Sequence, residues 1–400
     1  MRVARLSLTD FRSYRELDVT LGPRVTTLLG PNGAGKTNIV EAIRYLSILA
    51  SHRVSTDVPL IRAGAAVAVV RAKVERAGRA VVVEATIAPG RAKGYRLNGN
   101  PAKAREVAGV LRTVVFSPED LDLIKGDPSG RRRFLDELCV ALTPTLAGDL
   151  ADYDRVIRQK TALLKGARGR GSAPATLDVW DERQAELGAR IIRARLDAVA
   201  ALAPYVSSAY SDLSSGGDSA FTYESPSIAA PGAPGFPGGN LLPSGGIRGD
   251  ANPGDAAEKD LARRLIEAIG IARAKELERG VCLVGPHRDD LLVTLGGLPA
   301  RGYASHGESW SAALALRLGT YDLLTSASGP DSGGDGEPVL ILDDVFAELD
   351  AARRRALAER VAPAQQVIVT AAVPADVPAS LAGDVLLVGG GKVARDGDAG

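Results

Sequence analysis

Residues 25–50 read VTTLLGPNGAGKTNIVEAIRYLSILA and predict a strand, a glycine-rich loop and a helix in direct succession. The first five residues form a short apolar run, and after the loop apolar residues recur about every 3.6 positions, as on one face of a helix. The loop itself, residues 30–37, fits the pattern GxxxxGK[ST]. In loops of this kind, backbone N–H groups at the start of a helix cradle phosphate oxygens. The stretch therefore predicts a nucleotide-binding α/β domain.

The members of this loop have predicted roles in binding ATP or GTP. Glycine is required where a side chain would block the phosphate. Lys36 supplies a point charge to the β and γ phosphates and takes part in catalysis, and Thr37 places its hydroxyl on Mg²⁺. The predicted cofactor-binding residues of the loop are Gly30, Pro31, Asn32, Gly33, Ala34, Gly35, Lys36 and Thr37.

A second motif lies far downstream, where the apolar run VLIL at 339–342 ends in Asp343 and Asp344. Such a run is typical of a central parallel strand that is covered on both faces, and open α/β sheets bind ligands at the carboxyl ends of these strands. We expect Asp343 to bind Mg²⁺, directly or through water, and Asp344 to polarise the attacking water. The alternative is that the two aspartates only end a strand as turn residues. Together the two motifs make ATP or GTP hydrolysis the leading chemistry.

The expected strands and helices divide the chain into three parts. Residues 1–116 alternate like strands, include an Asn-Gly hairpin signal and hold the phosphate loop. Residues 117–280 carry long helical patterns and, at 214–257, a flexible surface insertion so rich in Gly, Pro, Ser and Ala that we expect no packed core there. Residues 281–400 return to strands and to the aspartate pair. The predicted fold class is α/β, a P-loop ATPase head split in sequence by a mainly helical lobe.

Composition and charge narrow the function further. The chain has 400 residues, 45% hydrophobic and 24% charged, which predicts two or three globular domains. No apolar run approaches the length of a membrane span, so we expect a cytoplasmic protein with no membrane partner. Cys139 and Cys282 are the only cysteines and form no CxxC pair, which argues against a disulfide framework or a zinc ribbon. The net charge of +1 predicts that any nucleic-acid contact depends on local patches.

Residues 305–308, Ser-His-Gly-Glu, stand directly before an apolar-periodic helix and allow two interpretations. The pattern S-x-x-E is a capping box, which would make Ser305 an N-cap and nothing more. The segment also lies after the phosphate loop and before Asp343, which is the order in which ABC-type ATPases carry their signature. In that class the signature helix meets the γ-phosphate held by a second subunit. The class also keeps a loop ending in a Leu-Asp pair after the catalytic strand, as residues 345–350 do here.

Five blocks of the chain together resemble the RecF family of bacterial recombination mediators, relatives of the structural-maintenance-of-chromosomes ATPases. The blocks, spread over most of the chain, are LSLTDFRSYRELDV, LLGPNGAGKTNIVEAI, FSPEDLDLIKGDPSGRRRFLDE, GPHRDDL and LILDDVFAELD. The resemblance implies an ABC/SMC-type head with no long coiled coil. It also implies that Ser305 and Gly307 form the signature, that Asp350 ends the loop crossing the dimer contact, and that all three help to bind ATP. Glu308 and Trp310 depart from the family pattern, which usually has Gln and a basic residue there.

The function implied by this resemblance is that of an ATP-dependent DNA-binding protein of recombinational repair and replication. Such a protein is a weak ATPase that binds ATP and Mg²⁺ and forms an ATP-driven homodimer on double-stranded or gapped DNA. With RecR and RecO as partners, it helps to load the strand-exchange recombinase at gaps or stalled forks. Two other classes stay open: the nucleotide-binding subunit of an ABC-type transporter, in which loop and signature normally lie closer together, and a P-loop kinase of small molecules.

A basic run in the helical part is the candidate DNA contact. Residues 155–170 read RVIRQKTALLKGARGR and contain no acidic residue. Contacts with DNA phosphates would make affinity fall steeply with salt and show little sequence preference. The alternative is a solvated helix face. The residues predicted to contact DNA are Arg155, Arg158, Lys160 and Lys165, and the run continues through Arg168 and Arg170.

Three further features receive mainly structural interpretations. The arginines at 131–133 fall inside a family block and are assigned a structural or nucleotide-sensing role. The arginines at 353–355 are expected on an exposed helix face. His287, in GPHRDD, is interpreted as a hydrogen-bonded turn histidine outside the active site.

Overall fold

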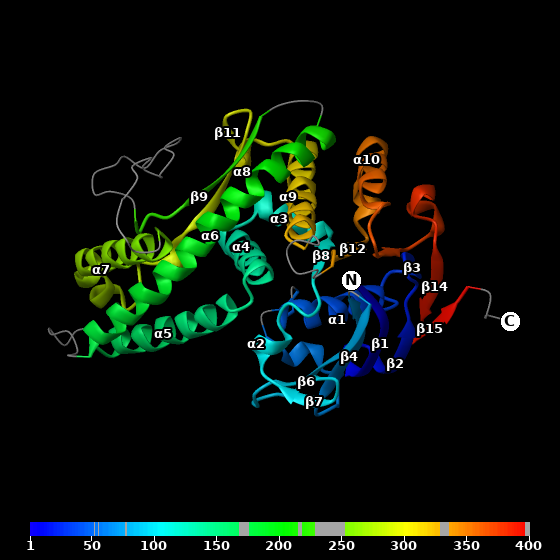
Figure 1. Cartoon of the computed structure of the whole chain (residues 1–400), viewed down its shortest axis with the longest axis horizontal. Coiled ribbons are helices and arrows are strands. Elements are labelled where there is room, and N and C mark those ends of the chain that lie inside the picture. The colour runs from blue at the N-terminus through cyan, green and yellow to red at the C-terminus, as the bar shows by residue number, and fades with distance from the viewer. Residues whose placement is uncertain are drawn as a thin grey trace.

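The computed structural model describes the chain except for residues 52, 55, 77, 168–175, 215–217, 229–252, 329–335 and 397–400. It consists of two parts that lie side by side, a head built on two β-sheets and a lobe built mainly from helices (Figure 1). Segments from both ends of the sequence form the head, and the middle of the sequence forms the lobe. The expected α/β class and the split head are confirmed.

The central sheet of the head is mainly parallel and has the strand order β15-β14-β3-β13-β12-β8. Every residue of β12 is buried, and alternate residues belong to different cores. Val339 and Ile341 pack toward the second sheet of the head, whereas Leu340 and Leu342 pack toward the lobe, so both faces of β12 are covered as predicted. The strands are β3 Val25–Leu29, β8 Thr113–Phe116, β12 Val339–Asp343, β13 Val367–Ala371, β14 Asp384–Gly389 and β15 Lys392–Arg395.

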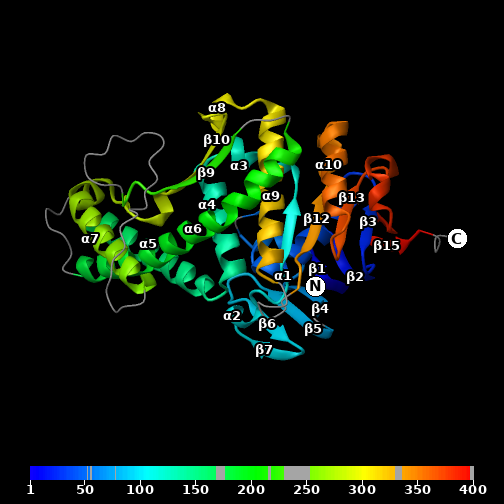
Figure 2. The same ribbon diagram turned by 45° about the horizontal axis from the view of Figure 1, so that its top comes forward.

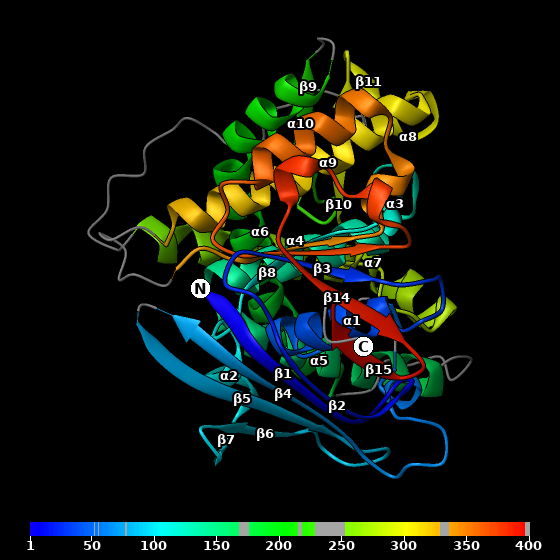
Figure 3. The same cartoon turned by 90° about the vertical axis from the view of Figure 1, so that its right-hand side faces the viewer.

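The second sheet of the head is antiparallel, with the order β2-β1-β4-β5-β6-β7. Helix α1 (Lys36–Ile48), which follows the phosphate loop, lies between the two sheets and shares one apolar core with both (Figure 3). The predicted turn at Asn98 and Gly99 joins β6 and β7 with φ angles of 50° and 82°, as a two-residue hairpin turn requires. The strands are β1 Arg2–Phe11, β2 Tyr14–Thr20, β4 Ala68–Arg76, β5 Arg79–Ile87, β6 Gly94–Leu97 and β7 Asn100–Ala102.

The lobe is organised around α6 (Leu177–Leu213), a helix of 37 residues, which at 1.5 Å per residue is about 55 Å long. Helices α5, α7 and α9 pack along it (Figure 2). The described part of the lobe has no long coiled coil, and none of the helices in the described ranges is both long and apolar enough to cross a bilayer. The other helices are α2 Ala104–Val107, α3 Leu121–Lys125, α4 Pro128–Leu142, α5 Leu146–Ala167, α7 Pro253–Arg279, α8 Ala300–Tyr303, α9 His306–Ser326 and α10 Ala351–Val361.

The lobe also holds a three-stranded sheet that differs from the expected division of the chain. β10 (Asp290–Leu295), expected in the C-terminal part of the head, pairs with β9 (Ser219–Glu224) and β11 (Leu298–Pro299). β9 falls inside the 214–257 insertion, yet its Tyr223 is buried in the core of the lobe. The composition of the insertion gave no sign of this strand, because its order depends on pairing with a distant partner. Most of the insertion, residues 215–217 and 229–252, lies outside the described residues.

Candidate nucleotide-binding site

The phosphate loop runs from the end of β3 to the start of α1 and is shaped by two glycines that cannot carry a side chain. A Cβ atom on Gly30 would lie 2.2 Å from the backbone oxygen of Val388. Gly35 adopts a φ of +108°, and a Cβ atom there would lie 2.7 Å from the hydroxyl oxygen of Tyr14. Both positions therefore require glycine because of packing inside the head, independently of any contact with phosphate.

Lys36 opens α1 and turns back over the loop. Its Nζ donates hydrogen bonds to the carbonyl oxygens of Gly30, at 2.8 Å, and Pro31, at 3.3 Å. The residue is only 3% exposed, so the ammonium group is held inside the curve of the loop. This places one positive charge beside the backbone N–H groups at the start of a helix, an arrangement that suits nucleotide phosphates.

Asp343 ends β12, and the hydroxyls of two threonines reach its carboxylate, one from the phosphate loop and one from β13. Thr370, on β13, donates its hydroxyl to Asp343 Oδ1 at 2.7 Å, and the Thr37 hydroxyl lies 3.4 Å from the same oxygen. The Thr370 hydroxyl oxygen also accepts the backbone N–H of Asp344 at 2.9 Å. The strands β3, β13 and β12 are neighbours, so their carboxyl ends meet at one edge of the sheet. Thr370 was not among the residues predicted from the sequence, although it lies near the end of an apolar strand pattern, which is the signal that could have indicated it.

The surroundings of Asp343 favour a cation. Burial raises the pKa of Asp343 to about 6 against the opposing hydrogen bond from Thr370, and the charges of Asp344 and Glu119 act in the same direction as burial. Hard oxygen atoms such as those of Thr37 and Asp343 are the ligands that Mg²⁺ prefers, which fits their predicted metal role. Within the described ranges no group of three or more His, Cys, Asp or Glu side chains gathers, so Mg²⁺ would take its other ligands from phosphate and water.

Asp344 faces a pocket of about 220 Å³ formed with the phosphate loop. Its φ of 51° turns the chain sharply after β12, so that Asp344 does not continue the strand. Arg53 lines the same pocket, and its guanidinium lies 3.7 Å from a carboxylate oxygen of Glu41 on α1. Arg53 is a second residue that the sequence analysis missed, and no local pattern marks it. The residues that line the pocket are Asn32, Gly33, Gly35, Lys36, Thr37, Asn38, Arg53 and Asp344.

The predicted signature lies at the start of α9 and does not line this pocket. The Ser305 hydroxyl accepts the Glu308 N–H at 3.2 Å, and the Glu308 carboxylate accepts the Ser305 N–H at 2.8 Å, so the capping box is present. Asp350 is the N-cap of α10 and accepts the N–H of Arg353 at 2.9 Å. Among the residues that the structure describes, no hydrogen bond or ion pair joins Ser305, Gly307 or Asp350 to the phosphate loop. Their assignment to ATP binding therefore stays a prediction.

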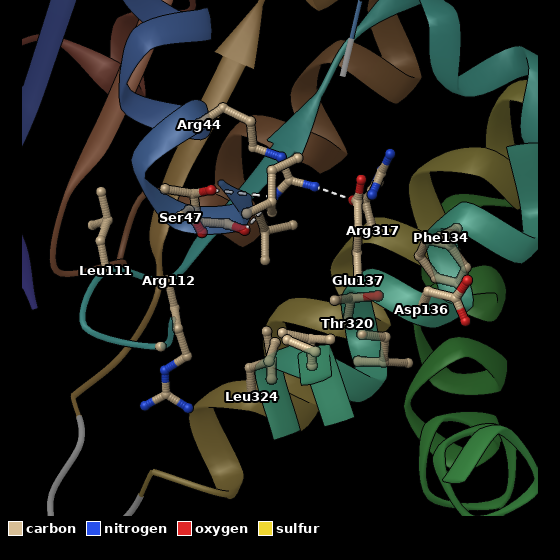
Figure 4. A pocket seen from close by; sticks show the side chains of 18 of the residues that line it. Arg44, Ser47, Leu111, Arg112, Phe134, Asp136, Glu137, Arg317, Thr320 and Leu324 are labelled. Carbon is tan, nitrogen blue, oxygen red and sulfur yellow. Dashed lines mark hydrogen bonds and ion pairs between the residues drawn. The ribbon is translucent and has the colours of Figure 1, made fainter. Parts of the chain in front are cut away.

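Helix α1 is also tied to the lobe by buried charges. Arg44 donates to the backbone oxygen of Thr113 at 2.8 Å and forms an ion pair with Glu137 on α4 (Figure 4). These residues line a cavity of about 240 Å³ that contains no residue of the phosphate loop. Arg317 of α9 lines the same cavity and pairs with Asp120 at 2.7 Å. Side chains from α1 and α9 thus line one cavity between head and lobe.

The basic run of the sequence lies along α5. Arg155, Arg158 and Lys165 are exposed there, as contact with DNA would require. Arg168 and Arg170 lie outside the described residues. Three of the four predicted DNA contacts are therefore accessible.

Lys160 is the exception, and the structure corrects its predicted role as a DNA contact. The residue is completely buried, and its Nζ lies 2.7 Å from a carboxylate oxygen of Asp181 and 2.9 Å from one of Glu276. It also donates a hydrogen bond to the Gln184 side chain at 2.9 Å. Because α5 packs against α6 and α7, the residues on its inner face are turned away from solvent. Lys160 therefore fastens three helices together and is not available to DNA.

His287 and Arg131 have the structural roles proposed for them. His287 donates from Nε2 to the Cys282 carbonyl oxygen at 3.2 Å, which leaves Nδ1 to accept the Tyr153 hydroxyl at 2.8 Å. Burial lowers the pKa of His287 to about 4, so the ring is neutral near pH 7. Arg131 holds both carboxylate oxygens of Asp290, at 2.7 and 2.8 Å. Both residues connect helices of the lobe to the segment around β10.

Comparison with known proteins covers nearly the whole chain. The model of the RecF/RecN/SMC N-terminal domain family matches residues 2–377. The DNA replication and repair protein RecF of Kineococcus radiotolerans is 54% identical over 391 residues, which is 96% of each chain. The protein of the same name from Frankia alni is 53% identical over 401 residues, covering 99% of this chain and 100% of its own length.

Solved structures also match nearly the whole chain. The recombination mediator protein RecF of the RecFOR pathway, in a structure with ATPrS, covers 98% of both chains with a TM-score of 0.82 and 27% identity. An Smc head bound to the C-winged helix domain of ScpA, at 18% identity and a TM-score of 0.53, shares the fold. Sequence, family model and fold therefore agree along the chain, which belongs to the RecF/RecN/SMC family and, within it, to the RecF proteins.

Proposed function

We propose that this protein is an ATP-dependent DNA-binding protein of recombinational repair and replication, in which ATP acts as a switch. The observation that carries the proposal is the meeting of the phosphate loop with Asp343 and Asp344 at one edge of the central sheet, although 306 positions separate Thr37 from Asp343. Relatives that match the chain from end to end bear the name DNA replication and repair protein RecF. This match includes the helical lobe, which the transporter alternative leaves unexplained.

The residues of the site support hydrolysis of a nucleoside triphosphate. Lys36 and the N–H groups of the loop hold the phosphates. Thr37 and Asp343 hold Mg²⁺, which neutralises charge on the phosphate oxygens when it is bound. Asp344 accepts a hydrogen bond from the attacking water and orients it toward phosphorus. Thr370 steadies both aspartates, because its hydroxyl donates to one carboxylate and accepts the backbone N–H of the next residue.

We infer that hydrolysis is slow because of the acidic residue in the signature. Glu308 is exposed, and its hydrogen bonds with Ser305 lower the pKa of its carboxyl, so it is negatively charged near pH 7. This carboxylate lies in the first turn of α9, where the signature would meet a γ-phosphate, and like charges repel there. Trp310, the other departure from the family pattern, is 2% exposed and presents no charge.

We infer that ATP drives formation of a homodimer. Within the described part of the chain, no hydrogen bond or ion pair joins the signature or Asp350 to the phosphate loop, so we expect a second chain to complete the site. A two-fold axis would bring the start of α9 in each chain to the γ-phosphate held by the other. ADP lacks the phosphate that bridges the two halves, so ADP should leave the protein monomeric.

The proposed partners are double-stranded or gapped DNA, together with RecR and RecO. Arg155, Arg158 and Lys165 supply exposed positive charges for DNA phosphates. The structure of a relative is described as that of the RecFOR pathway, which supports RecR and RecO as partners. With them, the protein would help to load the strand-exchange recombinase at gaps or stalled forks in the cytoplasm.

Light scattering behind a sizing column, run with Mg²⁺-ATP and with Mg²⁺-ADP, tests the switch. Asp344→Asn should slow hydrolysis while leaving nucleotide bound, so it should accumulate as a dimer in ATP. Ser305→Arg should bind ATP as a monomer, because a bulky side chain at the start of α9 blocks the phosphate of the other chain. Equal dimerisation in both nucleotides, or a Ser305→Arg protein that dimerises like the wild type, would contradict the proposal.

A further inference from the structure

Arg353, in the first turn of α10, lies against the signature segment and not on a free helix face. α10 runs beside α9 (Figure 2), and Arg353 Nε donates to the Ser311 hydroxyl of α9 at 2.9 Å. A Cβ atom on Gly307 would lie 2.8 Å from Arg353 Nη2 and 3.2 Å from Cζ. The guanidinium therefore covers Gly307, which corrects the expectation of an exposed face for Arg353, whereas Arg355 is exposed as expected.

The same guanidinium reaches the loop that ends at Asp350. Arg353 Nη1 forms an ion pair with the Asp350 carboxylate, whose other oxygen accepts the backbone N–H of Arg353 at 2.9 Å. Ser311 is fully buried and donates its own hydroxyl to the backbone oxygen of Leu213 on α6 at 3.2 Å. One side chain thus joins Asp350 to the first turns of α9, and the α9 end of this connection is anchored in the lobe.

The charge of Arg353 is unusual for its place. The N-terminal end of a helix carries partial positive charge and favours anions, so a cation beside the start of α9 is opposed by the helix. Asp350 offsets this in part. Among the described residues no acceptor receives a hydrogen bond from Nη2, which lies over Gly307.

We propose that Arg353 is a positioning residue that holds Asp350 and the signature as one unit, and that this unit serves the nucleotide bound by a second copy of the chain. The proposal rests on the proposed ATP-driven dimer. It predicts that a side chain at position 307 would push the guanidinium away from its present position over Gly307. It also predicts that loss of Arg353 leaves the phosphate loop of its own chain intact.

The first test separates ATP binding from hydrolysis. Arg353→Gln should bind fluorescent ATP at its own loop within about twofold of the wild type, while its hydrolysis rate falls by about tenfold or more, as expected when a distant contact misplaces a site. Arg355→Gln, at an exposed position on the same helix, is the matched control and should change neither value. Arg353→Lys should be as defective as Arg353→Gln, because an ammonium group cannot hold Ser311 and Asp350 together. A wild-type rate in either Arg353 variant overturns the positioning role.

The second test asks which chain Arg353 serves. Arg353→Gln and Asp344→Asn proteins, each expected to hydrolyse ATP slowly alone, are mixed as monomers before Mg²⁺-ATP is added. A mixed dimer has one complete site, with Asp344 from the first chain and Arg353 from the second. Because half of the dimers are mixed, we expect about a quarter of the wild-type rate per chain. If Arg353 served its own chain, the mixture would hydrolyse ATP no faster than the two variants alone, and the proposal would be overturned.

Light scattering of the same samples distinguishes failure of the ATP-driven dimer from failure of the role of Arg353. Wild-type protein that stays monomeric in Mg²⁺-ATP overturns the dimer and this proposal with it. Wild-type dimers together with a mixture no faster than the two variants alone overturn only the role of Arg353. If Arg353→Gln does not fold, as judged by its thermal melt, Arg353→Lys takes its place in the mixture and the same outcomes apply.

Discussion

Replacing Asp343 by asparagine should stabilise the nucleotide-free protein at neutral pH. Burial raises the pKa of the Asp343 carboxyl to about 6, so at pH 7.5 the folded protein holds an ionised group in a place that disfavours charge. Compared with the ordinary value of 3.8, this corresponds to about 3 kcal/mol at about 1.4 kcal/mol per pKa unit. Asparagine has nearly the same volume and no charge, and so removes this cost.

The pH dependence of this gain in stability follows from the numbers of protons that Asp343 binds in the folded and the unfolded states. Between pH 3.8 and about 6 the folded state binds more protons at Asp343 than the unfolded chain does, so the contribution of Asp343 to stability falls as pH rises. Below that window the carboxyl is protonated in both states, so replacement by asparagine changes the free energy of unfolding little. At pH 4.5 we therefore expect about one third of the gain at pH 7.5.

Differential scanning calorimetry in EDTA, without nucleotide, measures this directly. If the chain unfolds as one unit, a gain of about 3 kcal/mol raises the Tm by about 3–4 °C for a protein of this length. Asp344→Asn, at the more exposed neighbouring position, is the matched control and should move the Tm by less than about 1 °C. An unchanged Tm for Asp343→Asn at pH 7.5, or the same increase at pH 4.5, would refute the reasoning that a buried charge limits stability here.

Three further predictions concern the lysines and arginines of the chain. Lys36→Ala should weaken ATP binding by about 1.5–3 kcal/mol because a charge-assisted hydrogen bond to phosphate is removed, and an unchanged dissociation constant in a fluorescent-nucleotide titration would contradict the phosphate-loop assignment. Replacing Arg155, Arg158 and Lys165 by Gln should lower the slope of log affinity against log salt by about 0.9 for each DNA phosphate that the variant no longer binds, with ATP binding unchanged. Lys160→Met should destabilise the lobe by about 3–5 kcal/mol in thermal unfolding, because buried Glu276 loses its cation and buried Asp181 keeps only Arg273, and a melt like that of the wild type would speak against the buried ion pairs.

Local sequence patterns predicted those parts of the fold that depend on residues close together in the chain. The phosphate loop and the turn at Asn98 and Gly99 lie where their residue types require, since each needs a backbone conformation that few residues adopt. The burial of β12 was also predictable, because an unbroken apolar run can be satisfied only between two covering layers.

The residue roles that the sequence did not reveal depend on contacts between segments that are far apart along the chain. Lys160 belongs to a run of basic residues, and nothing in that run reveals that two carboxylates from other helices enclose it. Thr370 becomes a partner of Asp343 only because β13 lies next to β12 in the sheet. Arg353 looked like one of three equivalent arginines until its contact with Ser311 was known. In each case the role is set by the arrangement of elements.

The order of strands in the central sheet has a consequence for synthesis of the chain. β3 leaves the ribosome early, yet both of its sheet neighbours, β13 and β14, come from the last part of the sequence. At about 5–20 residues per second, β3 waits roughly 20–70 s before either neighbour exists. During that interval α1 and β1 are available to shelter its apolar side chains, but its backbone N–H and C=O groups have no strand to pair with. A nascent chain that stalls before β13 therefore carries an unpaired strand next to the phosphate loop. It is exposed to aggregation and proteolysis until translation is complete.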